Sequence, residues 1–273
     1  MKHGIYIANY ALQGEPSKFV QLAIEAERAE WDGFFIWDHI YPDPINIQQV
    51  TDPWITLAAI AASTDSIRLG TTVTPLPRRR PQKVAREVAT LDRLSGGRFT
   101  LGVGLGSDVL SEFSKFGEET DTKVRAEMLD ESLEILRGLW SGKEFTFQGK
   151  HYSIDNVTFK PRPKQKTVPI WCAGTWPLKA PFRRAARYEG VFPLSLNEFL
   201  TPKDFIDIRK YIDRYRTKKS DYDVIDLIQT KGPDDTEWIP VLSEAGVTWV
   251  QEVIMGQDMN EILERVKKGP VTR

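Results

Sequence analysis

Short apolar runs alternate along the chain with longer stretches in which apolar residues recur every three or four positions. The short runs, rich in β-branched and aromatic residues, span 5–8, 34–37, 67–73, 99–103, 168–172, 191–194, 223–228 and 247–254. Runs of this kind predict buried strands. The amphipathic stretches predict helices that start after Pro16 and near Pro53 and that span 81–94, 124–140, 182–187, 202–215, 234–245 and 259–267. This alternation is typical of α/β proteins with a parallel sheet, and the number of pairs favours a (β/α)8 TIM barrel.

One stretch departs from the alternation. Residues 144–166, between the predicted fourth helix and fifth strand, are too long for an ordinary connection. Because aromatic residues such as Phe145, Phe147 and Phe159 recur in it, we expect an insertion that packs as a loop or hairpin over one end of the barrel. A chain of 273 residues with 41% hydrophobic content can bury one large core, so residues 1–273 are predicted to form a single domain.

Net charge and cysteine content exclude several classes of function. The formal net charge is −1 and the densest basic run, Arg78-Arg79-Arg80, is three residues long, so nucleic acid is not an expected partner. The single cysteine, Cys172, cannot form an intramolecular disulfide and offers no metal-ligand cluster. We therefore expect no metal site and a reducing, cytoplasmic location. No segment approaches the roughly 20 apolar residues of a membrane span, and the first apolar run is too short for a signal peptide.

The residues that follow the predicted strands form a second pattern. In a TIM barrel the carboxyl ends of the strands carry the active site. Those positions are Asn9, Asp38 with His39, 71–74, 104–107, 173–176 and Leu194 with Ser195. Glycine, serine and threonine at three of them permit close backbone approach and offer hydroxyl or N–H donors, as a phosphate or a flat ring requires. A phosphorylated cofactor is therefore expected at this end.

Asp38 and His39 come directly after a strand of apolar residues. A histidine at a strand end would project into the mouth of the barrel, and imidazole exchanges protons near neutral pH. We predict that His39 is a catalytic acid or base; the alternative is that it caps the neighbouring loop. Asp38 is the second catalytic candidate, although its carboxylate would serve equally to orient the imidazole or to cap a helix.

The glycines after the fourth and fifth strands have structural as well as functional interpretations. Gly102, Gly104 and Gly106 resemble a dinucleotide-binding fingerprint, but the last glycine that the pattern requires is absent, so a Rossmann site is excluded. Gly102 is expected to serve strand packing, while Gly104 and Gly106 shape the loop. Gly174 is expected either in a turn or beside a phosphate.

Arginine and tryptophan side chains near the strand ends also have two interpretations. In the run 78–80 we expect two solvated arginines and one that faces a phosphate or an acidic substrate. Trp37, Trp54 and Trp176 are expected to pack in the core, although an aromatic at these positions would also suit the wall of a site for a ring-shaped ligand.

Several of these segments together resemble the luciferase-like monooxygenase family. The similar segments are IRLGTTVTPL at 67–76, RRP at 79–81, LDRLSGGRFTLGVG at 91–104, the helix at 131–140, FQGKHY at 147–152 and PIWCAG at 169–174. The resemblance extends well over residues 1–195 and in outline over the rest. It implies a TIM barrel with reduced FMN, or the deazaflavin coenzyme F420, lying across the mouth.

The resemblance also implies roles for individual residues. His39 would lie beside the ring, and Thr72 and Val73 would be joined by a non-prolyl cis peptide that bulges against it. The loop after the fifth strand would grip the phosphate. With the end of the first strand and the loop after the fourth, the predicted cofactor-binding residues are Asn9, Thr72, Val73, Gly104, Gly106, Ser107, Ala173, Gly174 and Thr175. Ser107 stands where some deazaflavin dehydrogenases have a glutamate, which disfavours a sugar-phosphate dehydrogenase.

The expected function is a flavin-dependent oxidoreductase that acts on a small organic substrate. FMN, the first choice of cofactor, implies a monooxygenase, whereas F420 implies hydride transfer. NAD(P)H or a separate flavin reductase is the expected source of electrons, and the predicted second and third helices would form a homodimer face, as in the family. Two alternatives stay open: a flavin-binding protein without turnover, and a non-redox, phosphate-binding TIM-barrel enzyme, which would commonly need a strand-end lysine or a carboxylate pair.

Overall fold

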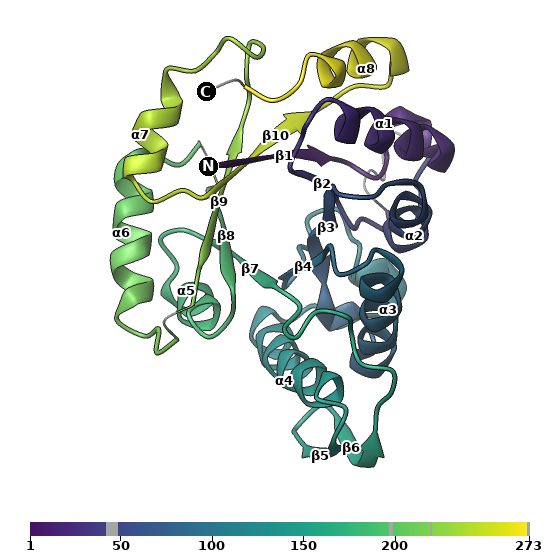
Figure 1. The fold of residues 1–273 in the computed structure, drawn as a ribbon. Helices are drawn as coiled ribbons and strands as arrows, with labels where there is room; N and C mark the ends of the chain where they lie inside the picture. Colours follow the sequence, from purple (N-terminus) through teal and green to yellow (C-terminus); the bar gives the residue numbers. More distant parts are fainter. Residues whose placement is uncertain (42–48, 197–198, 219, 272–273) are drawn as a thin grey trace.

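The predicted barrel is present in a computed structural model that describes residues 1–41, 49–196, 199–218 and 220–271 (Figure 1). Its strands are β1 (Lys2–Ile7), β2 (Gly33–Ile36), β3 (Arg68–Pro75), β4 (Phe99–Gly104), β7 (Ile170–Thr175), β8 (Gly190–Leu194), β9 (Asp223–Ile228) and β10 (Trp249–Ile254). All pair in parallel, and they close in the order β1-β10-β9-β8-β7-β4-β3-β2. The TIM-barrel prediction is confirmed.

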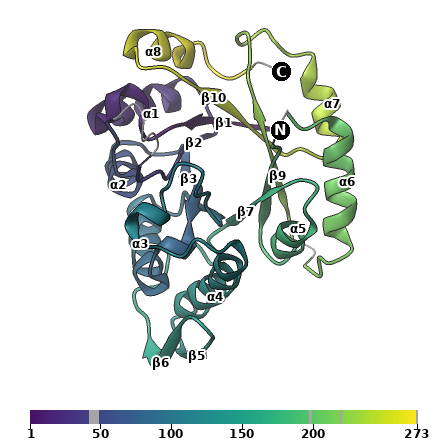
Figure 2. The same ribbon diagram turned by 180° about the vertical axis from the view of Figure 1, so that it is seen from behind.

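Helices form the outer layer of the barrel, as Figure 2 shows from behind. They are α1 (Pro16–Arg28), α2 (Pro53–Ser63), α3 (Pro81–Leu94), α4 (Thr122–Trp140), α5 (Lys179–Ala185), α6 (Pro202–Asp213), α7 (Trp238–Glu244) and α8 (Met259–Lys267). Several begin at a proline, which suits the first helical turn because it lacks an N–H. At α2 the carboxylate of Asp52 also accepts a hydrogen bond from Ile55 N at 2.8 Å, so cap and proline together set the start.

Large aromatic side chains fill the interior of the barrel. Alternate strand residues point inward, and the buried cluster there consists of Phe35, Trp171, Phe192, Ile225 and Trp249. Glycines make room for it: a Cβ on Gly33 would lie 2.5 Å from the Phe35 ring. Because this cluster fills the interior, a ligand has to bind at the mouth.

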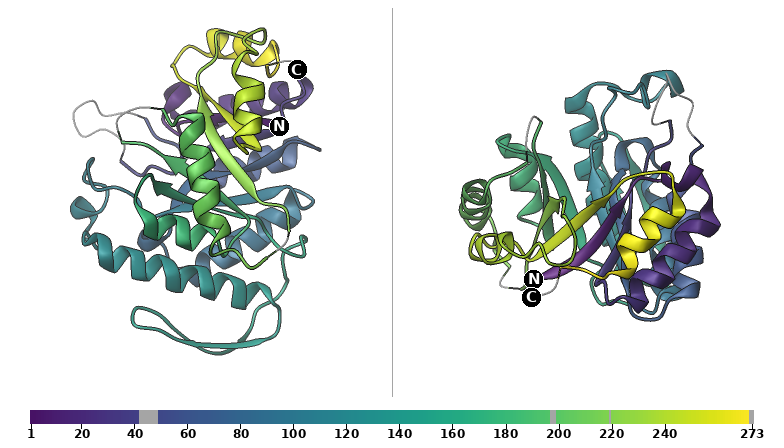
Figure 3. Two further views of the ribbon diagram at one scale, coloured as in Figure 1. Left: turned by 90° about the vertical axis from the view of Figure 1, so that its left-hand side faces the viewer. Right: turned by 90° about the horizontal axis from the view of Figure 1, so that it is seen from above.

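The insertion forms an antiparallel hairpin of β5 (Glu144–Gln148) and β6 (Ser153–Thr158). The expected hairpin is confirmed, but its expected position over one end of the barrel is wrong. It packs on α4, where the Glu131 carboxylate accepts hydrogen bonds from the backbone amides of Lys150, His151 and Tyr152 at 2.7–3.0 Å. Figure 3 shows the hairpin on the far side of α4 from the strands. Within the described residues, no helix has the length and apolar character needed to cross a membrane.

Candidate active site

Charged side chains gather where β2, β3 and β4 end. They line a pocket of about 210 Å³ and include His39, Asp38, Arg79 and Glu112. His39 and Asp38 follow β2, Arg79 follows β3, and Glu112 lies in the loop after β4. The site therefore stands at the carboxyl ends of the strands, where the barrel architecture predicts it.

His39 is held by Glu112, a residue that no sequence pattern marks as part of the site. Its Nδ1 lies 2.8 Å from a carboxylate oxygen of Glu112, and the two side chains are 28% and 5% exposed. The other oxygen of Glu112 accepts hydrogen bonds from Ile40 N at 2.6 Å and Tyr41 N at 2.9 Å. Burial alone would raise the pKa of Glu112, but the hydrogen bonds from His39, Tyr41 and Ile40 outweigh it and lower the pKa to about 2.

Asp38 does not orient the imidazole, so that expectation is wrong. Its carboxylate is taken up by side chains from α2, β3 and the segment after β3. The carboxylate accepts hydrogen bonds from Thr74 Oγ1 at 2.8 Å and Trp54 Nε1 at 3.1 Å. Asp38 is 5% exposed. Through these hydrogen bonds it joins the end of β2 to β3 and α2, as part of the wall of the site.

The arginine run is not a solvated charge run. Arg79 Nη2 donates to both carboxylate oxygens of Asp38 at 2.8 Å, and Arg78 Nη2 donates to the Asp38 backbone carbonyl. Only Arg80 is exposed in this run. The default of two solvated arginines is therefore wrong, because a buried carboxylate requires charged partners that the sequence did not reveal.

Aromatic rings form the wall beside His39. The Trp37 ring lies 4.9 Å from Tyr6, 5.8 Å from Tyr10 and 5.7 Å from His39, between centroids. Trp37 Nε1 and Thr72 Oγ1 are buried and have no hydrogen-bond partner among the described residues. An unpaired buried donor costs about 1–3 kcal/mol, so both atoms fit a ligand that supplies acceptors.

Asn9 is fully buried below this wall. Its Nδ2 donates to the His39 carbonyl at 2.8 Å and to the Thr51 carbonyl at 2.9 Å. The amide is thereby occupied by the protein itself, and Asn9 holds the segment that carries His39.

The bulge in β3 has the geometry that the family resemblance implied. The peptide between Thr72 and Val73 is cis, and the pairing register with β4 shifts between Thr71 and Thr74. Gly104 lies opposite, where a Cβ would come within 2.9 Å of Val73. Any larger residue at position 104 would therefore crowd the Val73 side chain at the bulge.

The glycine-rich segment after β4 is packed tightly. Gly106 has φ +73°, and a Cβ there would lie 2.6 Å from the Phe113 ring. Ser107 is exposed, and its Oγ accepts a hydrogen bond from Val109 N at 3.3 Å. Gly106 therefore turns the chain, while Ser107 faces solvent beside the mouth.

Ala173, Gly174 and Thr175 belong to β7, not to a loop after it. The predicted strand ended too early because these residues pair with Phe192, Pro193 and Leu194 of β8. A Cβ on Gly174 would come within 2.3 Å of Pro181, so this glycine permits close packing of α5. Ala173 packs against the interior cluster at the mouth.

A sequence profile described as the luciferase-like monooxygenase family matches residues 2–223. The chain belongs to this family. An F420-dependent glucose-6-phosphate dehydrogenase of Kineococcus radiotolerans is 34% identical over 168 residues, which are 61% of this chain and 49% of the relative. An F420-dependent hydroxymycolic acid dehydrogenase of Mycobacterium tuberculosis is 34% identical over 181 residues, with 65% and 49% covered. The chain thus spans about half the length of these relatives.

Solved structures of two kinds share the fold of this luciferase-like protein. An F420-dependent secondary alcohol dehydrogenase in complex with an F420-acetone adduct has a TM-score of 0.81 at 20% identity, over 98% of this chain and 97% of the other. The oxygenating constituent of 3,6-diketocamphane monooxygenase from Pseudomonas putida, in complex with FMN, has a TM-score of 0.76 at 17% identity, over 98% and 96%. At these TM-scores both structures share the overall fold of the present chain, in agreement with the TIM-barrel assignment.

Proposed function

We propose that this luciferase-like protein is an oxidoreductase that uses coenzyme F420 to transfer a hydride to or from a small organic substrate. The observation that carries the proposal is the pairing of His39 with Glu112 at the mouth of the barrel. A buried carboxylate that orients a partly exposed imidazole is an arrangement suited to proton transfer, which hydride transfer to a carbonyl or from an alcohol also requires.

The pairing determines which nitrogen of His39 handles the proton. With its pKa at about 2, Glu112 is ionised at neutral pH and can only accept a hydrogen bond. The proton of the neutral ring therefore stays on Nδ1. Nε2 is left to take a proton from a substrate hydroxyl, or to return one when the reaction runs in reverse.

The choice of F420 rests on the relatives. The two dehydrogenases named above are F420-dependent and 34% identical to this chain. FMN is bound in a monooxygenase structure that is only 17% identical. This reverses the order expected from the sequence, in which FMN came first. Monooxygenation with FMN is the second candidate, because the family profile carries the monooxygenase description.

The residues present fit a flavin-like ring. When bound, F420 accepts or supplies the hydride. Trp37 Nε1 and Thr72 Oγ1, which have no hydrogen-bond partner within the described part of the chain, would donate hydrogen bonds to it. Val73 and Gly104 would support the ring at the bulge, and Gly106, Ser107, Ala173 and Thr175 would border the rest of the cofactor.

The test is an absorbance titration of the purified protein with F420 and, separately, with FMN, followed by turnover assays of His39→Asn. We expect selective F420 binding, and a loss of turnover of about 10²–10⁴-fold with cofactor affinity retained, because the variant removes the proton acceptor. His151→Asn is the matched control, since His151 lies on the hairpin and bonds Glu127. Selective FMN binding with rapid oxygen consumption would favour the second candidate, and unchanged turnover of His39→Asn would refute the role of His39.

The remaining expectations stay predictions. They are a homodimer formed through α2 and α3, a supply of electrons from NAD(P)H or a reductase if FMN is used, and a cytoplasmic location. For the dimer, α2 presents Ile55 with 72% of its surface exposed.

A further inference from the structure

The barrel wall is incomplete between β8 and β9. These strands pair only at Gly190 with Asp223 and at Val191 with Val224. By contrast, β8 pairs with β7 through to Leu194. Pro193 has no N–H to donate, so the carboxyl-terminal half of β8 diverges from β9. The divergence leaves an opening at the mouth.

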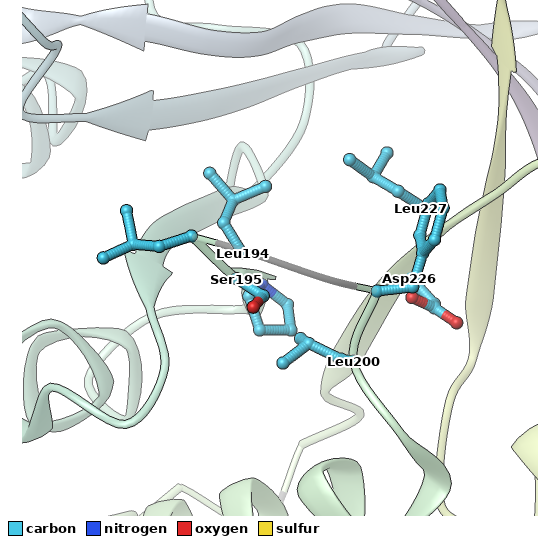
Figure 4. Close-up of a pocket in the computed structure, with 8 residues that line it drawn as sticks. Leu194, Ser195, Leu200, Asp226 and Leu227 are labelled. Atoms are coloured by element: carbon cyan, nitrogen blue, oxygen red, sulfur yellow. The ribbon is translucent and has the colours of Figure 1, made fainter.

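A pocket of about 550 Å³ occupies this opening, which is within the range of ligand pockets. Figure 4 shows Leu194, Leu200 and Leu227 spread around it, with the carboxylate of Asp226 at one side. The loop after β8 adds Leu196, which is 82% exposed. The lining contains no lysine, arginine or histidine among the described residues.

Asp226 is the one charged group in this lining, among the described residues. It is 7% exposed. Burial raises its pKa to about 7, a hydrogen bond from Leu227 N lowers it only in part, and no charged side chain of the described chain contributes. A buried carboxyl without a basic partner in a concave, apolar site is a candidate for binding a ligand that carries a positive charge.

The pocket lies across the mouth from His39. In the closed barrel, β8 is four strands from β2 in either direction, so the two strands stand opposite each other. A substrate anchored in this pocket therefore has to extend across the mouth, so that its reacting carbon lies beside His39 and the ring.

We propose that the pocket between β8 and β9 binds the substrate of the proposed oxidoreductase, and that it selects an apolar molecule with a protonated amine, which the Asp226 carboxylate receives. The assignment as substrate site rests on the proposed function. A phosphorylated sugar is disfavoured, because a carboxylate repels phosphate and the described lining offers no cation to offset it.

Three probes that share an indole ring and a two-carbon chain but differ in charge test the proposal: tryptamine, indole-3-propionate and 3-ethylindole, measured by calorimetry at pH 8 on the full chain. We expect tryptamine to bind about tenfold or more tighter than indole-3-propionate, with 3-ethylindole between them, because a charge-assisted hydrogen bond forms only with the amine. Asp226→Asn should abolish the preference and leave the binding of 3-ethylindole unchanged. Equal binding of all three probes, or no binding by any at millimolar concentration, would overturn the proposal.

Two further variants guard against a general effect of charge or folding. Asp234→Asn changes the net charge equally at an exposed position and should keep the tryptamine preference. Leu196→Lys places a cation on the exposed rim and should shift the preference toward indole-3-propionate. A tryptamine preference unaffected by both Asp226→Asn and Leu196→Lys would place the amine elsewhere and refute the site.

The F420 titration separates this proposal from the proposed function. If F420 binds and the probes show no dependence on Asp226, the function stands and the substrate class fails. If the preference depends on Asp226 but neither F420 nor FMN binds, the amine site stands and its assignment to an oxidoreductase fails.

Discussion

His39 shows how far a single residue can be interpreted from sequence. Its strand-end position was enough to predict that it lies in the mouth, because side-chain direction alternates along a strand. Its partner was not predictable, because Glu112 is 73 residues away in an irregular loop after β4. In such a loop no periodic pattern indicates which acidic side chain points toward the site. The same limit applies to Asp38, whose partners Thr74 and Arg79 come from another strand end.

Replacing Glu112 tests the pair directly. Glu112→Gln should lower the free energy of unfolding by about 1–3 kcal/mol at pH 7, since it removes the charge that accepts three hydrogen bonds. A folded-state pKa of about 2, below the ordinary value of 4.5, means that this stabilisation is complete above pH 4.5 and is lost as the pH falls toward 2. Urea unfolding at pH 7 and pH 4 should therefore show a smaller difference from wild type at the lower pH.

Glu118→Gln is the control for this measurement. Glu118 lines the same pocket but is exposed, so its replacement should change stability by less than about 0.5 kcal/mol at either pH. Equal losses for the two variants, or a Glu112→Gln loss independent of pH, would mean that the hydrogen bonds of Glu112 do not stabilise the folded chain as described.

At the scale of elements, a helix start was predicted where a proline marks it, whereas α7 begins at Trp238 and not at the expected residue 234. Proline and aspartate mark helix starts locally, and α3 has the predicted bounds, Pro81–Leu94. The end of β7 was missed because Gly174 resembles a turn residue, whereas its small size serves the approach of Pro181. The insertion was recognisable as a hairpin from its length and aromatics, but its place on α4 depends on Glu131, a contact between distant segments that no local pattern encodes.

The hairpin gives a prediction at this scale. Glu131→Ala removes the acceptor of three backbone amides, so the hairpin should open more often while the barrel stays intact. Limited proteolysis should cut within 144–158 about tenfold faster, the ratio that corresponds to a loss of about 1.4 kcal/mol. Glu134→Ala, at an exposed position of α4, should be cut by the protease at the wild-type rate. A loss of cofactor affinity in Glu131→Ala alone would instead mean that the hairpin supports the site.

For the whole molecule, the arrangement of buried carboxyls governs the dependence of stability on pH. Burial raises the pKa of Asp226, and it also raises the pKa of Asp223 and Glu252 despite hydrogen bonds from Trp171 and Arg265. Between about pH 4 and pH 7 the folded chain keeps protons that the unfolded chain has released. The contribution of these three groups to stability should therefore fall as the pH rises through this range. Closing the barrel buries these three carboxyl groups. Among the described residues, only Glu252 of the three has an arginine hydrogen-bonded to its carboxylate.

Asp226→Asn should remove most of this slope. The rise in the pKa from 3.8 to about 7 corresponds to at most about 4 kcal/mol, so the variant should be about 2–4 kcal/mol more stable than wild type at pH 8 and nearly equal to it at pH 4. Urea unfolding followed by tryptophan fluorescence measures both, with Asp234→Asn as the control for net charge. If Asp226→Asn gained nothing at pH 8, the carboxyl would already be paired in the free protein. A higher free energy of unfolding at pH 8 would instead mean that wild type holds an unpaired charge beside the opening between β8 and β9. A protonated amine bound there should then stabilise wild type but not the variant.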